Sequence, residues 1–293
     1  MDLDCRGCAG CCLDWRPLVP ATERDRLDHE RRGPYPPLDD AYNLVPLDRD
    51  EVRGFLDAGL GDVMTPRLWA ADRDDPHVTV AGQRLAAIGG RPAFFVGLRK
   101  PPKPVAPFDR DDPAWLPTCV FLDPQTLQCR IHDDERYPTE CADYPAHNLA
   151  LGHETECERV EAAWGESRLL DDAVPPDVGE RLRFGPQAIG STVFCHPEPA
   201  EITGVVDRLV ADELTATDRA EFVAVAAASS PGTVAISDSH YEAAKTAALE
   251  ASSWAGAAIG DWERLADAVD PRPEHAVAVE DERGAPATPG WDD

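Results

Sequence analysis

The strongest constraint in this sequence is a run of closely spaced cysteines near its start, Cys5-x2-Cys8-x2-Cys11-Cys12. A gap of two residues lets two thiolates converge on one centre, so this spacing recurs in zinc and iron–sulfur sites. Glycines lie inside the run, and glycine lets the backbone come close to sulfur and adopt positive φ. The spacing therefore predicts a tight metal-binding loop.

A second group of cysteines follows in the middle of the chain, and its members are Cys119, Cys129, Cys141 and Cys157. In a reducing compartment, clustered cysteines indicate metal ligands or redox groups more than disulfides. The chain has nine cysteines, and an odd number cannot be fully paired within one chain. We expect all eight cysteines of the two groups to be metal ligands.

The doublet Cys11-Cys12 bears on how many centres there are. In extended backbone, neighbouring side chains point to opposite sides, so one ion would not easily take both thiolates. A doublet suits two adjacent centres, or one cluster whose outer thiol is a spare ligand or redox partner. Eight thiolates could form two four-cysteine sites, and the sequence leaves open which four belong together.

The long and irregular gaps of the second group bear on the metal. Structural zinc sites usually use two Cys-x-x-Cys pairs. An iron–sulfur cluster is larger than an ion and tolerates longer gaps. We therefore expect an iron–sulfur cluster with a redox or electron-transfer role. The alternative is a structural zinc-binding module that serves protein interaction without catalysis.

Three other residues could be considered as ligands. Cys195 stands apart in the chain, and a free cysteine is commonly a small buried residue. His132 and His147 lie near the second cysteine group. Metal sites commonly have polar neighbours that do not bind the metal, so we expect both histidines to be neighbours of the site.

The charge of the chain excludes some partners. The formal net charge is −27, from 55 acidic and 28 basic residues, and only Lys100, Lys103 and Lys245 are lysines. Such a field repels nucleic acid and anionic membranes, because binding to them depends on basic residues that neutralise phosphates. Abundant carboxylates with few lysines are typical of adaptation to high salt, where salt screens their repulsion.

The chain begins Met1-Asp2-Leu3-Asp4, without the basic and apolar segments of a signal peptide. It contains no stretch of about 20 apolar residues, the length that crosses a membrane. We therefore expect a cytoplasmic protein. It also lacks a phosphate-binding loop, a nucleophile elbow and a His-Glu-x-x-His motif, so the sequence predicts no particular reaction and leaves a protein partner open.

The pattern of the first 165 residues predicts a small α+β metal-binding domain with a short sheet. Asp48-x-x-Glu51 is a capping box, so a helix is expected to begin there and to end near Gly59. Residues 77–99 have the pattern of strands, with Gly89-Gly90 at a hairpin turn. Residues 100–117 are proline-rich and are expected to be loop.

The remainder is expected to be a mainly helical region over 166–269 and a disordered acidic tail over 270–293. A helical stripe begins at Ile202. Capping boxes at Asp218-x-x-Glu221 and Ser239-x-x-Glu242 predict two further helices, the second ending near Val269. Proline, glycine and acidic residues dominate the tail.

Three segments together resemble the YkgJ-type cysteine-cluster family, also described as a CxxCxxCC zinc- or iron-chelating domain. They are the run from Cys5 to Cys12, the segment from Cys119 to His132, and Arg136-Tyr137-Pro138-Thr139-Glu140-Cys141-Ala142-Asp143-Tyr144-Pro145. The resemblance covers about residues 1–160 and implies a metal-chelating module, often with an iron–sulfur cluster and no settled reaction. The chain departs from the family in having Ala142 after Cys141, His132 where tyrosine is usual, and Glu158-Arg159 after Cys157.

Overall fold

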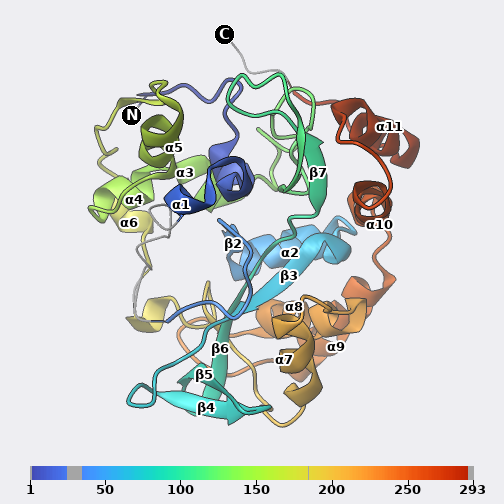
Figure 1. Ribbon diagram of the computed structural model, residues 1–293. Helices are drawn as coiled ribbons and strands as arrows, with labels where there is room; N and C mark the ends of the chain where they lie inside the picture. Colours follow the sequence, from blue (N-terminus) through green and yellow to red (C-terminus); the bar gives the residue numbers. More distant parts are fainter. Residues whose placement is uncertain (1, 25–34, 184, 290–293) are drawn as a thin grey trace.

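The computed structural model describes residues 2–24, 35–183 and 185–289, which form a mixed α+β fold (Figure 1). The strands are β1 (Asp2–Leu3), β2 (Pro46–Leu47), β3 (Met64–Leu68), β4 (His77–Val80), β5 (Gln83–Ile88), β6 (Arg91–Leu98), β7 (Pro102–Val105), β8 (Ala114–Pro117), β9 (Leu169–Asp171) and β10 (Phe194–Cys195). The α-helices are α1 (Ala21–Arg24), α2 (Arg49–Asp57), α3 (Thr139–Asp143), α4 (Ala146–Ala150), α5 (Glu156–Trp164), α6 (Val178–Arg181), α7 (Thr203–Val210), α8 (Ala216–Ala228), α9 (Asp238–Glu250), α10 (Trp254–Ala266) and α11 (Pro273–Arg283). Short 3-10 turns are η1 (Gly10–Cys12), η2 (Arg16–Leu18), η3 (Gly61–Val63) and η4 (Gly185–Gln187).

Strand β6 is the centre of a six-stranded antiparallel sheet. It pairs with β2, β3, β5 and β10 along its length. The predicted hairpin is confirmed, because Gly89 and Gly90 have φ of 60° and 77° and connect β5 to β6. Glycine takes this left-handed backbone without the penalty that a Cβ imposes.

Helix α8 packs on this sheet and shares its hydrophobic core. Phe222 of α8 lies edge-on to Phe94 of β6, with ring centroids 4.8 Å apart, and Phe94 also contacts Phe194 of β10. The contiguous cluster of buried apolar side chains extends from Cys8 to Ala276. The hydrophobic core is therefore not divided at the predicted boundary near residue 165.

The structure confirms one predicted helix start and corrects two others. Asp48 caps α2 by accepting from the backbone N–H groups of Asp50 and Glu51, and Glu51 completes the capping box. Helix α8 begins three residues earlier than predicted, with Thr215 as N-cap and Asp218 as the third helical residue. The capping box predicted at Ser239-x-x-Glu242 is wrong, since α9 begins at Asp238 with Ser237 as N-cap and without a side-chain cap hydrogen bond. The helix end predicted near Val269 is also wrong, because α9 ends at Glu250 and Ser253 caps a separate helix, α10.

The proline-rich segment 100–117 is also not entirely loop, because β7 and β8 form an antiparallel pair within it. Pro102 lies opposite Pro117, and Pro104 lies opposite Trp115. In a two-stranded sheet each strand has an outer edge, where a residue without an N–H group loses no ladder hydrogen bond. The prolines therefore limit the pairing to two strands and do not prevent it.

The prediction of a disordered tail over 270–293 is wrong for residues 273–283, which form α11. Glu280 on this helix is fully buried and accepts from Lys103 Nζ at 2.9 Å and from Arg130 Nη2 at 2.6 Å. Lys103 is also fully buried and donates to the carbonyl groups of Val120 and Leu122. Paired buried charges thus hold α11 against the segment that carries two of the cysteines. Residues 290–293 lie outside the described part of the chain.

We predict that Glu280→Ala lowers the free energy of unfolding by about 3–5 kcal/mol, because it removes the buried carboxylate that Lys103 contacts and one of the two carboxylates that Arg130 contacts. Urea unfolding at a fixed high salt concentration measures this. The matched control is Glu282→Ala on the same helix, where the glutamate is exposed and a change within about 0.5 kcal/mol is expected. Equal destabilisation by both substitutions would contradict the role of the buried network.

Candidate metal centre

The N-terminal cysteines lie on a loop whose backbone is bent at two left-handed positions. Gly7 has φ of 64° and Ala9 has φ of 53°. The Cys8 N–H group donates to the Cys5 carbonyl at 3.2 Å, and the Gly10 N–H group lies 3.5 Å from the Cys8 sulfur. A backbone N–H that points at sulfur favours the thiolate form, as metal binding requires.

The doublet Cys11-Cys12 lies in the 3-10 turn η1, and so the prediction from extended backbone is wrong. In this turn the two sulfur atoms are 3.8 Å apart and form a hydrogen bond. Cys11 is exposed and Cys12 is half-buried. The hydrogen bond lowers the pKa of the Cys11 thiol and raises that of Cys12, because the shared proton stays with Cys12.

Cys119 and Cys129 are brought to the doublet by a backbone joint and a hairpin. The Cys119 N–H group donates to the Cys12 carbonyl at 2.7 Å. Leu122 then pairs with Cys129 in an isolated antiparallel bridge. The turn between them is closed by the Asp123 carboxylate, which accepts from the backbone N–H groups of Gln125 and Thr126. Side-chain capping of this kind is what aspartate supplies in tight turns.

Cys141 lies on α3 and reaches the same region through Tyr137. The Tyr137 hydroxyl lies 3.5 Å from the Cys141 carbonyl. The Tyr137 ring contacts the ring of His132, with centroids 5.0 Å apart, and the His132 N–H group donates to the Cys129 carbonyl. The charges of Cys119, Cys11 and Cys129 add to the effect of burial in raising the pKa of the Cys141 thiol.

Cys157 lies in the first turn of α5, which Thr155 and Glu158 begin with a capping box. Helix α5 packs closely on η1, since a Cβ at Gly10 would lie 2.7 Å from Val160 Cγ2. Cys157 and Val160 are three residues apart and therefore share the helix face that meets the N-terminal loop. Burial raises the pKa of the Cys157 thiol, and the charges of Cys11, Cys5 and Cys8 raise it further.

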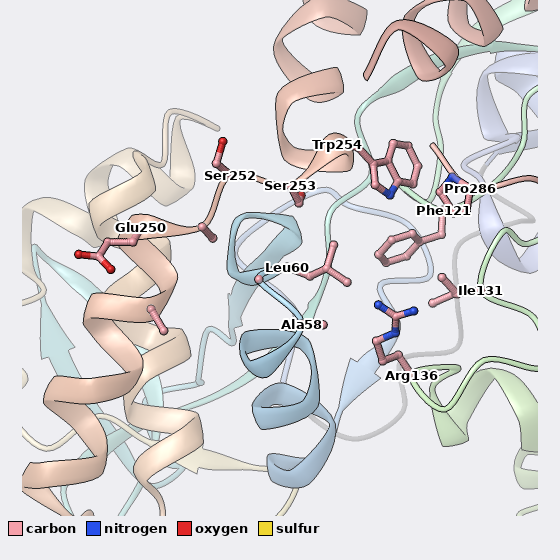
Figure 2. Close-up of a pocket in the computed structure, with 13 residues that line it drawn as sticks. Ala58, Leu60, Phe121, Ile131, Arg136, Glu250, Ser252, Ser253, Trp254 and Pro286 are labelled. Atoms are coloured by element: carbon pink, nitrogen blue, oxygen red, sulfur yellow. The ribbon is translucent and has the colours of Figure 1, made fainter. Parts of the chain in front are cut away.

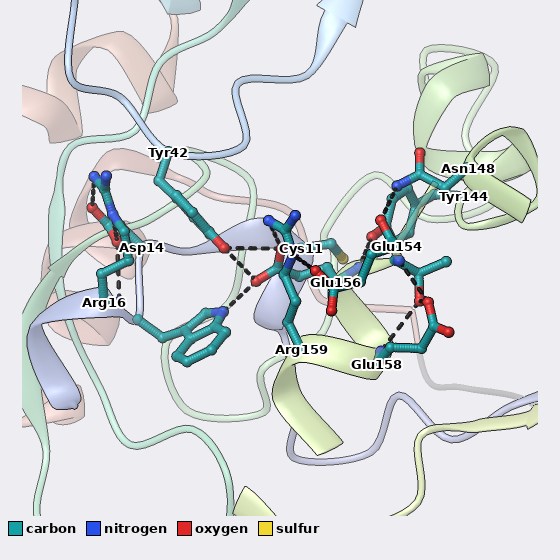
Figure 3. Close-up of polar contacts among 12 residues, drawn as sticks. Cys11, Asp14, Arg16, Tyr42, Tyr144, Asn148, Glu154, Glu156, Glu158 and Arg159 are labelled. Carbon is teal, nitrogen blue, oxygen red and sulfur yellow. Dashed lines mark hydrogen bonds and ion pairs between the residues drawn. The ribbon is translucent and has the colours of Figure 1, made fainter. Parts of the chain in front are cut away.

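Beside Cys157 lies a buried carboxylate that the sequence did not single out. Glu156 accepts from the Tyr42 hydroxyl at 2.9 Å and from Trp15 Nε1 at 2.5 Å, and its own N–H group donates to the Tyr144 hydroxyl (Figure 3). Burial raises the pKa of this carboxyl. These contacts tie α5 to the segments that contain Trp15, Tyr42 and Tyr144. Only the tertiary structure brings them together, so no local pattern could have found this network.

Two basic side chains lie close to the thiols. Lys100 Nζ is 3.4 Å from the Cys11 carbonyl, and burial lowers its pKa while the charges of Cys12 and Cys119 oppose that change. Arg168 donates to the Arg6 carbonyl at 2.8 Å. Burial raises the pKa of the Cys5 thiol to about 12 and that of Cys8 to about 11, and the Arg168 charge opposes both rises. Two cations thus lie where burial would otherwise disfavour the negatively charged thiolates.

Within residues 2–24, 35–183 and 185–289, no group of three or more histidine, cysteine, aspartate or glutamate side chains is arranged so that it could hold a metal ion. What the described residues do show is eight free thiols that influence one another's pKa.

Three other residues were candidate ligands from the sequence, namely Cys195, His132 and His147. Cys195 lies in β10, 3% exposed, and burial raises its pKa to about 11 without a contribution from another cysteine. His132 pairs with Asp133, and His147 lies within hydrogen-bonding distance of Glu140.

A surface pocket of about 470 Å³ lies next to the Cys119–Cys129 hairpin (Figure 2). Phe121, Ile131, Leu60 and Trp254 contribute apolar side chains, and Arg136 adds a guanidinium. The described residues that line it include none of the cysteines. Arg136 is already paired with Asp134, which raises the pKa of the arginine. The pocket is therefore distinct from the region of the eight cysteines of the two groups, here called the thiol site.

None of the described helices has the length and apolar character needed to cross a membrane. A family model with the description "Family of unknown function (DUF7531)" matches residues 1–292. No curated protein and no solved structure matches the chain.

We predict that, in metal-free reduced protein, iodoacetamide modifies Cys11 before Cys5 or Cys129. The pKa of Cys11 is lowered by its hydrogen bond to Cys12, whereas burial raises the pKa of Cys5 and of Cys129 to about 12. Since the thiolate is the reacting form, Cys5 labelling should rise about tenfold per pH unit between pH 7 and 9, and Cys11 labelling should rise less. Peptide mass spectrometry measures both rates.

Urea-unfolded protein is the control for this labelling, because its cysteines should react at similar rates. If folded protein showed equal rates for Cys11 and Cys5, the assigned difference in pKa would be wrong.

Proposed function

Since the chain belongs to the DUF7531 family, whose function is unknown, we propose from its thiol site that it is an iron–sulfur protein with a redox or electron-transfer role. The observation that carries the proposal is the gathering of cysteines from distant segments around one doublet. Cys119 is bonded to the backbone of Cys12, and Cys157 lies on the helix packed against that turn. The similarity of these segments to the YkgJ-type cysteine-cluster family agrees with this proposal.

The donor chemistry of the site fits an iron–sulfur cluster. All eight cysteines are free thiols, and cluster irons are held by cysteine thiolates, commonly four per cluster. The irregular gaps between the cysteines suit a cluster because it is larger than an ion. When bound, such a cluster supplies one-electron chemistry. The residues that would hold it are Cys5, Cys8, Cys11, Cys12, Cys119, Cys129, Cys141 and Cys157.

The surrounding residues supply what thiolates need in a buried place. The ammonium of Lys100 and the guanidinium of Arg168 oppose the negative charge that would accumulate on the sulfurs. The hydrogen-bonded Glu156 fixes the start of α5 and therefore the position of Cys157. Nearby charge and hydrogen bonds set the reduction potential of such centres, so these residues would tune it.

We further propose a cytoplasmic protein adapted to high salt. The net charge of −27 needs screening, and free thiols persist in a reducing compartment. The chain should therefore be purified anaerobically in concentrated salt, so that neither repulsion nor oxidation disturbs the site.

The proposal predicts a coloured protein with a broad absorption band in the violet, together with iron and acid-labile sulfide. Metal analysis and visible spectroscopy on anaerobically purified protein test this. Cys8→Ser should lower the iron content at least twofold, because Cys8 lies within the N-terminal loop. The matched control is Cys195→Ser, a buried cysteine in β10 that should leave iron and sulfide unchanged.

A colourless protein with stoichiometric zinc would refute the iron–sulfur proposal and favour a structural zinc module for protein interaction. Equal loss of iron in Cys8→Ser and Cys195→Ser would indicate a general effect of losing a thiol and would contradict the assigned site.

A further inference from the structure

We infer that the eight cysteines form two separate four-cysteine sites that meet at the doublet, and this inference rests on the proposed function. The first site, here called the N-terminal set, consists of Cys5, Cys8, Cys11 and Cys157. The second, here called the hairpin set, consists of Cys12, Cys119, Cys129 and Cys141. Four thiolates are the usual ligand set of one iron–sulfur cluster, so each set would hold one cluster.

The N-terminal set is defined by the contact between the first loop and α5. The Cys5 carbonyl accepts from the Cys8 N–H group, which holds these two residues in one turn. A Cβ at Gly10 would lie 3.5 Å from the Cys8 sulfur and 2.7 Å from Val160 on α5. Cys157 shares the helix face of Val160 and thus faces the loop that carries Cys5 and Cys8.

The hairpin set is defined by a chain of backbone contacts on the other side of the doublet. The Cys12 carbonyl accepts from Cys119, and the Cys119 carbonyl accepts from Leu122, which is paired with Cys129. The Cys129 carbonyl accepts from His132, whose ring lies on Tyr137, and the Tyr137 hydroxyl reaches the Cys141 carbonyl. Each link joins neighbouring segments, so the four cysteines lie on segments that are connected in space.

The doublet Cys11-Cys12 is the junction between the N-terminal set and the hairpin set. Its two sulfurs are 3.8 Å apart, whereas the other cysteines of the two sets lie on different segments. Cys11 is exposed, and Cys12 is joined to Cys119 through its own carbonyl. Lys100 lies at the same point, with Nζ 3.4 Å from the Cys11 carbonyl, where it can offset charge from both sets. Two centres built in this way would lie side by side.

Three double variants with the same number of serine substitutions test this division after anaerobic reconstitution with iron(II) and sulfide. Cys5→Ser/Cys157→Ser removes ligands from the N-terminal set only, and Cys129→Ser/Cys141→Ser removes them from the hairpin set only. Each should retain about half of the wild-type iron, because one complete set of four thiolates remains. Cys5→Ser/Cys129→Ser damages both sets and should lose nearly all of it.

Loss of nearly all iron in all three variants would mean a single shared site and would overturn the division. Half retention in the cross-set variant would mean that the cysteines are grouped differently. If wild-type protein takes up neither iron nor sulfide, the proposed function itself fails, which is a distinguishable result. If circular dichroism shows that the variants do not fold, the electron paramagnetic resonance spectrum of fully reduced wild-type protein decides. Two neighbouring clusters give a magnetically coupled spectrum, and one cluster does not.

Discussion

The backbone joint between residues 12–14 and 117–119 is the constraint on which the thiol site depends. Cys119 donates to the Cys12 carbonyl, Asp14 donates to the Pro117 carbonyl, and Leu13 pairs with Thr118. These contacts satisfy backbone groups that would otherwise be buried without partners. The same contacts hold together cysteines that are about 100 residues apart in the chain. The N-terminal loop is thus joined by backbone contacts to the rest of the fold.

The site also depends on how a strongly acidic chain uses its few lysines. Two of the three, Lys100 and Lys103, lie near the cysteines, and Lys103 is fully buried. Lys103 joins the carbonyl groups of Val120 and Leu122 to Glu280 of α11. The Lys103 ammonium thus connects the Cys119–Cys129 hairpin to α11. It also lies near thiols that would become negatively charged as thiolates. Replacing it by an apolar residue would remove one of the two buried cations that Glu280 contacts within the described part of the chain.

The predicted elements succeeded where local chemistry decides the structure. The Asp48 capping box and the Gly89-Gly90 turn need only neighbouring residues, and both are confirmed. The predictions failed where distant residues decide. Helix α11 looks like a disordered tail because its composition is acidic, yet Glu280 is held by Lys103 from 177 residues away. Strands β7 and β8 look like loop because of their prolines, yet each strand has an unpaired edge that accepts them.

By itself, the sequence determined the identity of the candidate ligands, since the spacing of cysteines with intervening glycines is a local property. It also determined the acidity of the surface and the mixed α+β class. Only the tertiary structure decided which of the cysteine-bearing segments contact one another. The doublet lies in a 3-10 turn, where both sulfurs come within 3.8 Å, and not in extended backbone. That geometry, and the buried Glu156 beside it, depend on packing between segments that no periodicity in the sequence reports.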